Sequence, residues 1–162
     1  MVERVMKWKL CIGLLLLVGF AEAQTIGDLR PIVGLTYGLK IEKPGLNIGA
    51  EYLLLDNFGA VFNYETFFTE ENVTFRSVHF DGRYYFQGGQ LQYYGLFGYV
   101  RNTTQFPGQE KITKGGLNFG AGTLYRLSFA DRFALFAQVR FSTPNQSQLA
   151  GYGGVTYLLN MK

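Results

Sequence analysis

The residues best suited to chemistry lie in one stretch, Thr74 to Phe86 (TFRSVHFDGRYYF). Its alternate positions bring Ser77, His79 (the single histidine of the chain), Asp81 and Arg83 onto one surface of a β-strand. A hydroxyl, an imidazole and a carboxylate are the groups used in nucleophilic and general acid–base catalysis. However, side chains two positions apart in a strand are separated by about 7 Å, which makes direct contact between nucleophile and base within this strand awkward.

A second interpretation is that these side chains form an interior ion network. The same parity of the other strand-like segments carries charges of both signs, separated by glycines. Buried charges must be paired because an unpaired one is costly, and the sequence supplies partners of matching sign. We favour this network over a catalytic site and predict these members: Lys40, Glu51, Glu65, His79, Asp81, Arg83, Arg126 and Arg140.

Metal and cofactor sites are not expected. One histidine and one cysteine cannot form the usual metal-binding clusters. The glycines of Gly116 to Gly122 (GLNFGAG) fall in strand-like alternation with no helix after them, which argues against a phosphate-binding loop.

Residues 1–23 have the pattern of a secretory signal peptide. Basic residues precede an apolar run from Leu10 to Phe20, and Ala21-Glu22-Ala23 fits a cleavage site. The run is too short for the roughly 20 residues of a spanning helix. We therefore expect a single mature domain, 24–162, that leaves the cytoplasm and retains no cysteine, since Cys11 lies in the leader.

The mature sequence divides into strand-like segments of roughly 10 residues with a period of two. Eight such segments are expected: Pro31 to Lys40, Leu46 to Leu55, Phe58 to Phe68, Thr74 to Phe86, Leu91 to Arg101, Gly115 to Leu127, Arg132 to Phe141 and Leu149 to Leu159. The fifth has leucines and aromatics on both parities, so its inward side is left open. Short links alternate with longer polar ones, which is typical of an antiparallel up-and-down meander.

Alternation alone does not say which face of a barrel is apolar. Strand length, the leader, and a polar parity rich in glycine and balanced charge favour an interior that is polar and an exterior that is apolar. Aromatics near the segment ends suggest two interfacial belts. We predict belts formed by Phe58, Phe86, Tyr94, Tyr125, Phe133 and Tyr157 near the short turns, and by Phe68 and Phe141 near the longer loops.

Together these features resemble the small bacterial outer-membrane β-barrels of the OmpA/OmpX type, over nearly the whole mature chain. The resemblance implies an all-β fold, an eight-stranded antiparallel up-and-down transmembrane β-barrel in the outer membrane, in contact with its lipid. It also implies that the polar parity faces the lumen. Many members end in an aromatic residue, whereas this chain ends Leu159-Asn160-Met161-Lys162.

The segment 102–114 is the longest expected loop and the best candidate for contact with an extracellular or envelope protein, through Phe106, Lys111 and Lys114. A solvated loop with no partner is the alternative. The formal net charge of +3 gives no electrostatic footprint for nucleic acid. Porin-like conduction is not favoured, because side chains fill the lumen of eight strands.

The leading function is therefore a non-catalytic barrel with a structural, adhesive or interaction role. One alternative is an outer-membrane lipid-modifying enzyme similar to a lipid A deacylase, although such an enzyme would place its Ser and His near the lipid, and Ser77 and His79 fall on the lumen parity. The other is a soluble lipocalin-like binding protein, against which the absence of tryptophan from the mature chain counts, since Trp8 lies in the leader.

Overall fold

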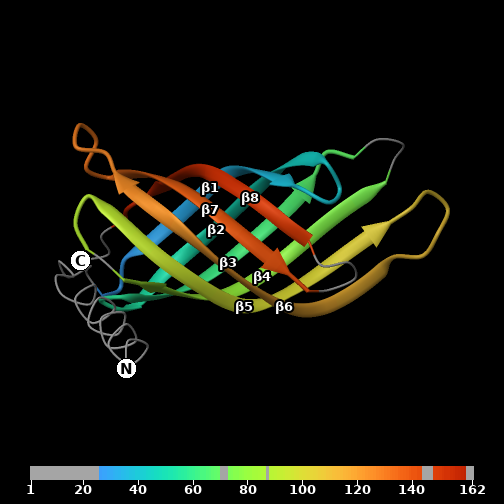
Figure 1. Ribbon diagram of the computed structural model, residues 1–162, viewed down its shortest axis with the longest axis horizontal. Coiled ribbons are helices and arrows are strands. Elements are labelled where there is room, and N and C mark those ends of the chain that lie inside the picture. Colours follow the sequence, from blue (N-terminus) through green and yellow to red (C-terminus); the bar gives the residue numbers. More distant parts are fainter. Residues whose placement is uncertain (1–25, 70–72, 87, 144–147, 160–162) are drawn as a thin grey trace, which may run out of the picture.

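The chain forms a closed barrel of eight strands, each antiparallel to its neighbours (Figure 1). The computed structural model describes residues 26–69, 73–86, 88–143 and 148–159. The strands are β1 (Leu29–Gly38), β2 (Lys43–Leu55), β3 (Phe58–Phe67), β4 (Thr74–Tyr85), β5 (Leu91–Gln105), β6 (Ile112–Arg126), β7 (Phe133–Ser142) and β8 (Gln148–Tyr157). The predicted all-β fold and strand number are confirmed.

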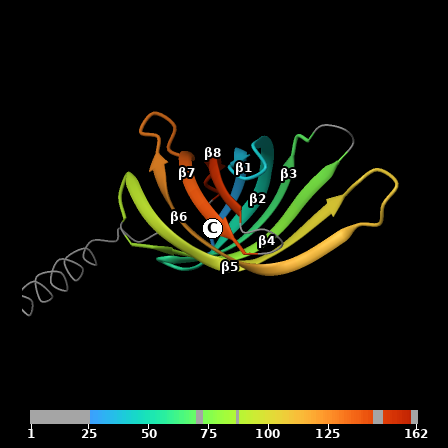
Figure 2. The ribbon, with the colours of Figure 1, turned by 45° about the vertical axis from the view of Figure 1, so that its right-hand side comes forward.

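Consecutive strands are neighbours around the whole barrel, and β1 pairs with β8 to close it, with Val33 opposite Val155 (Figure 2). The strand pairs β1–β2, β3–β4, β5–β6 and β7–β8 are connected at one end of the barrel, here called the loop end. The pairs β2–β3, β4–β5 and β6–β7 are connected at the other end, here called the turn end. No helix among the described residues is long and apolar enough to cross a membrane.

Alternate residues of each strand face the lumen and the outer wall of the barrel. In β4, Ser77, His79, Asp81 and Arg83 are buried in the lumen, whereas Phe80 on the other side is 59% exposed. The same holds around the barrel, where the large apolar side chains point outward and many polar ones are buried. This is the reverse of a lipocalin-like barrel, whose apolar side chains would line the interior.

Glycines make room for the few large residues inside. The ring of Phe136, on β7, lies against Gly34 of β1 and Gly154 of β8, and a Cβ built on either glycine would fall within 3 Å of that ring. Interiors are packed closely, so a ring of this size fits only where its neighbours have no side chain. The glycines on the lumen parity are thus part of the core packing.

Several strands extend beyond the predicted segments. β1 begins at Leu29, which brings Arg30 into the barrel, and β2 begins at Lys43, so Pro44 lies in a strand rather than in a loop. The expected loop 102–114 was wrong in its bounds: β5 runs to Gln105 and β6 starts at Ile112. Regular backbone pairing continues through polar residues there, from Asn102↔Lys114 to Thr104↔Ile112, because pairing does not need an apolar face.

The tip of the β5–β6 hairpin is a tight turn. The amide of Gln109 donates a hydrogen bond to the carbonyl of Phe106 over 3.2 Å, and Gly108 has a φ of 70°. Proline followed by glycine at the two central positions is the signature of a type II β-turn. The hairpin therefore extends past the rest of the barrel as an ordered two-stranded arm (Figure 1).

The structure also fixes the phase of the fifth strand. Gln92, Tyr94, Leu96, Val100 and Asn102 are buried, and the intervening residues face outward. Tyr94 was therefore wrongly assigned to an outward aromatic belt, because it is only 1% exposed. The other predicted belt residues lie on outward positions: Phe58, Phe68, Phe86, Tyr125, Phe133, Phe141 and Tyr157.

Candidate functional site

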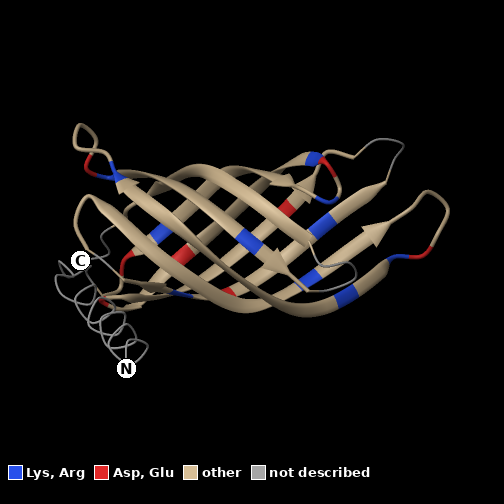
Figure 3. Cartoon of the chain, viewed as in Figure 1, with Lys and Arg blue, Asp and Glu red and all other residues tan. Residues whose placement is uncertain are grey.

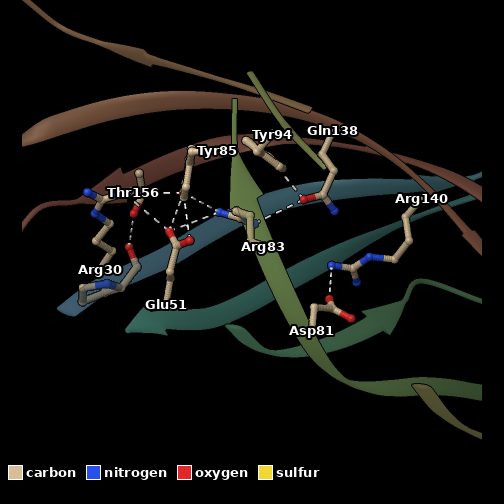
Figure 4. Close-up of polar contacts among 10 residues, drawn as sticks. Arg30, Glu51, Asp81, Arg83, Tyr85, Tyr94, Gln138, Arg140 and Thr156 are labelled. Carbon is tan, nitrogen blue, oxygen red and sulfur yellow. Dashed lines mark hydrogen bonds and ion pairs between the residues drawn. The ribbon is translucent and has the colours of Figure 1, made fainter. Parts of the chain in front are cut away.

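The buried polar side chains of the lumen form three successive layers around Glu51, Asp81 and Glu65. Glu51 is the centre of the layer nearest the turn end (Figure 4). Its Oε2 atom lies 3.3 Å from Nη1 of Arg83 and 3.7 Å from Nη1 of Arg30. The hydroxyl of Tyr85 donates to the same carboxylate over 2.7 Å. The fully buried carboxylate of Glu51 is therefore the shared partner of two arginines and of the Tyr85 hydroxyl.

The middle layer joins three strands through Asp81. Arg140, on β7, donates from Nη2 to Oδ2 of Asp81 over 2.9 Å. Asn118, on β6, donates from Nδ2 to the other carboxylate oxygen over 2.7 Å. Both oxygens of this buried carboxylate are therefore engaged by side chains from β6 and β7.

The third layer, nearest the loop end, is built on Glu65. Its carboxylate accepts hydrogen bonds from the hydroxyls of Thr36, at 2.7 Å, and Tyr152, at 3.2 Å. Nε2 of His79 lies 3.0 Å from Oε2 of Glu65. This layer differs from the other two because no arginine contacts its carboxylate among the described residues.

Aromatic rings cover the arginines of the network. The guanidinium carbon of Arg83 lies 4.2 Å from the centroid of the Tyr94 ring, and that of Arg140 lies 4.9 Å from the centroid of Tyr152. Cation–π contacts of this kind gain strength when the cation is removed from water. The rings of Tyr94 and Tyr152 therefore both stabilise the buried guanidiniums and fill the lumen beside them.

The formal charges of the buried network balance. Among the residues that the structure describes, three arginines and three carboxylates are fully or almost fully buried: Arg30, Arg83, Arg140, Glu51, Glu65 and Asp81. A balanced, hydrogen-bonded set can be held in a low-dielectric interior, whereas a net charge there would be strongly unfavourable. The arrangement is therefore that of a packed polar core.

The structure brings six of the eight predicted network residues into these layers, and the assignment of Lys40 was wrong. Lys40 lies in the turn after β1 and is exposed, because β1 ends at Gly38 and the inward parity does not continue past it. Arg126 is half-buried at the turn end of β6, at the margin of the lumen. Sequence reasoning missed Arg30, although it lies two positions before the inward Ile32.

The geometry around His79 does not resemble a nucleophile–base pair. Besides the contact of Nε2 with Glu65, Nδ1 lies 3.2 Å from Nδ2 of Asn118. Both ring nitrogens therefore have neighbours other than Ser77, and both side chains are buried in the lumen. Within the described part of the chain, no group of three or more His, Cys, Asp or Glu could hold a metal ion.

Little space remains in the lumen at the level of the third layer. A cavity of about 10 Å³ is lined by Glu65, Ser77, His79 and Asn102, among others. One water molecule needs roughly 10 to 15 Å³ of such space. The cavity is therefore at the scale of a single solvent molecule.

The predicted contact residues lie on the projecting hairpin. Phe106, at its tip, is 39% exposed, and Lys111 and Lys114 are also exposed. Lys114 lies in β6 rather than in a loop. The side-chain hydroxyls of Thr103 and Thr113 are 3.2 Å apart across the two strands and help to hold the arm together.

The fold is that of small eight-stranded outer-membrane β-barrels. The N-terminal β-barrel domain of Pseudomonas aeruginosa OprF is similar with a TM-score of 0.70 at 17% identity, over 84% of this chain and 100% of that one. Yersinia pestis Ail, in complex with the heparin analogue sucrose octasulfate, is similar with a TM-score of 0.63 at 19% identity, over 83% and 100% of the two chains.

A third solved structure, the outer membrane protein OprG from Pseudomonas aeruginosa, is similar with a TM-score of 0.63 at 11% identity, over 87% of this chain and 100% of that one. No protein-family model matches the chain, and no curated protein matches its sequence. The likeness therefore identifies the fold, and the function has to be argued from the residues of this chain.

Proposed function

We propose that this protein is an integral outer-membrane barrel, non-catalytic, that presents its β5–β6 hairpin to an extracellular or envelope protein. The observation that carries the membrane location is the inversion of the barrel. Large apolar side chains such as Leu35 and Phe97 are 63% and 60% exposed on the outer wall, while arginines and carboxylates are buried inside. Only a bilayer offers such a wall a favourable surrounding, and a closed barrel satisfies its backbone hydrogen bonds there.

The proposed non-catalytic role is supported by the position of the candidate chemical groups. Ser77 and His79 point into a lumen that is packed with side chains, and His79 is held by Glu65 and Asn118. A lipid substrate would approach from the outer wall, which presents apolar side chains. The polar layers are thus better explained as a structural core than as a site.

The interaction role is supported by the hairpin. Strands of outer-membrane barrels carry short turns on the periplasmic side and their larger extensions on the extracellular side. The arm formed by β5 and β6 extends past the barrel at the loop end, opposite the end where the described N- and C-terminal strand ends lie (Figure 1). It offers an exposed aromatic, Phe106, beside the charges of Glu110 and Lys111.

Membrane fractionation combined with heat-modifiability on a gel tests the location and the closed barrel together. We expect the protein in the outer-membrane fraction, extractable only with detergent, and migrating faster before boiling than after. Recovery from the periplasm without detergent would overturn the membrane proposal.

A photo-crosslinking residue at Phe106 tests the interaction role in intact cells. Phe129, 85% exposed in the connection at the turn end, is the matched control position. We expect a crosslinked protein from position 106 that is absent from position 129 and is lost when 105–112 is replaced by a two-residue turn. Equal crosslinking from both positions would contradict the proposed use of the hairpin.

A further inference from the structure

Charge on the outward face of the strands is confined to two residues, Arg76 on β4 and Arg101 on β5. The three carboxylates of the strands are all buried in the lumen, and the remaining strand cations lie on the inward parity. No carboxylate forms an ion pair with either arginine within the described part of the chain. Two guanidiniums thus project from a wall that is otherwise uncharged.

The two arginines are diagonal neighbours. Arg101 is opposite Val78, and Arg76 is opposite Thr103, so the two side chains occupy the same outward face of adjacent strands, one rung apart. Diagonal positions in an antiparallel pair are about 7 to 8 Å apart, within reach of long side chains that converge on one group. Figure 3 shows several basic residues on the strands toward the loop end of the barrel.

The arginines occur where the outer wall changes in character. The rung on their turn-end side is apolar and aromatic, with Phe62, Phe80 and Tyr99 in register across β3, β4 and β5. The rung of Arg76 carries hydroxyls instead, with Thr66 and Thr103 as its cross-strand partners. The hydroxyl of Tyr99 lies over Gly115, the residue opposite Arg101, at the same boundary. This sequence of rungs is typical of an interface between hydrocarbon and headgroups.

We propose that Arg76 and Arg101 bind the phosphate of a lipid headgroup in the leaflet that surrounds the loop end. The guanidinium is planar and presents several N–H donors, which suits bidentate binding of phosphate oxygens. The aliphatic stems lie along the apolar wall while the charged groups reach the headgroup level. The inference rests on the proposed membrane location and adds to it a specific class of lipid.

A lipid is favoured over a free anion because of where the two groups project. They leave the wall sideways, next to Val78 and Tyr99, rather than from the tip of the hairpin into solvent. A phosphate carried by a lipid is held at that level by its own acyl chains. A soluble anion would gain the same contacts only by entering the interface without such an anchor.

Binding of phosphatidic acid to the folded barrel in detergent micelles, read by native mass spectrometry, tests the proposal against phosphatidylcholine as the neutral reference. We expect preferential retention of phosphatidic acid by the unaltered protein. Each arginine near a charged lipid surface contributes about a fivefold change in affinity, so Arg76→Gln and Arg101→Gln should each weaken binding about fivefold, and the double variant further. The Arg76→Lys/Arg101→Lys variant should retain part of the affinity.

The matched control removes two exposed cations from the connections, in Lys40→Gln/Arg132→Gln. It should bind phosphatidic acid as the unaltered protein does, and an equal loss would show a general charge effect and overturn the proposal. Displacement of the lipid by inorganic phosphate or by sucrose octasulfate at low concentration would assign the site to a soluble anion instead. Heat-modifiability of every variant is measured first. A folded, detergent-extracted barrel without lipid preference refutes this inference alone, whereas a protein that needs no detergent refutes the membrane proposal.

Discussion

Replacing Glu51 by Gln should destabilise the barrel far more than the same change at Glu65. Glu51 faces two arginines and Tyr85. A glutamine at this position leaves both buried guanidiniums without a carboxylate, and its own NH2 group would face the N–H groups of the arginines. Breaking a buried ion pair by removing one partner costs about 3 to 5 kcal/mol. We expect Glu51→Gln to lower the free energy of unfolding by about that amount.

Glu65 is the control because it is equally buried but has no arginine partner. Its contacts are the hydroxyls of Thr36 and Tyr152 and the ring of His79. Thr36 donates to Oε1 and Tyr152 to Oε2, so the carbonyl oxygen of glutamine keeps one of the two hydroxyls, and the other hydroxyl can rotate to accept from the amide. The loss is that of weakened charge-assisted hydrogen bonds, about 1 to 3 kcal/mol. Removing the charge of Glu65 also removes the free-energy cost of burying that charge, so the destabilisation by Glu65→Gln stays small.

Urea unfolding of the refolded barrel, residues 24–162, in detergent micelles, followed by far-ultraviolet circular dichroism and by gel mobility, measures both variants. Trp8 is the single tryptophan of the sequence and lies in the predicted leader, outside residues 24–162, so circular dichroism is the better probe. Equal destabilisation by the two substitutions would refute the view that Glu51 holds the arginines. The double variant Glu51→Gln/Arg83→Gln should be less unstable than the sum of the single variants, by about 1 to 3 kcal/mol, because it removes one of the stranded charges.

Three further outcomes are expected. Gly154→Val should destabilise the barrel by about 1 to 3 kcal/mol in the same assay, because its side chain would collide with Phe136, while Gly153→Val on the outward face should be close to neutral. Gly108→Ala, at a φ of 70°, should strain the hairpin turn by about 1 kcal/mol and increase proteolysis at residues 106–111 without lowering the global midpoint. The unaltered protein should show no stepwise currents in planar bilayers, since packed layers occupy the lumen; regular channel steps would contradict that packing.

The alternation of β4 could be read from the sequence because its polar and apolar residues separate cleanly by parity. Ser77, His79, Asp81 and Arg83 lie inside, as predicted, and their partners come from strands with equally clear patterns. The fifth strand had no such signal. Tyr94 is apolar enough for the outer wall, and only the position of Arg83 on the adjacent strand β4 shows why the tyrosine ring is needed inside.

Strand ends were harder to predict than strand interiors. In the sequence, Lys40 continues the inward-facing alternate positions of the first segment. In the structure, β1 ends at Gly38 and the Lys40 side chain is exposed. Arg30 lies one residue before the first predicted segment, 31–40, although it pairs with Glu51. At the β5–β6 hairpin, polar residues suggested a loop, whereas cross-strand pairing continues to Thr104. Where strands pair beyond the apolar wall, their residues are polar on both faces. The sequence then has no hydrophobic alternation from which the ends of these strands could be predicted.

The distribution of charge limits where this barrel can interact with other molecules. Inside, the buried arginines and carboxylates balance and hold one another, so a ligand would have to disrupt layers such as Asp81 with Arg140. On the outer wall, apolar side chains leave only Arg76 and Arg101 as charged groups. Specific recognition is therefore expected at the loop end, where the proposed lipid site and the projecting hairpin lie close together. The lipid and protein contacts proposed here use different residues, so each can be abolished without the other.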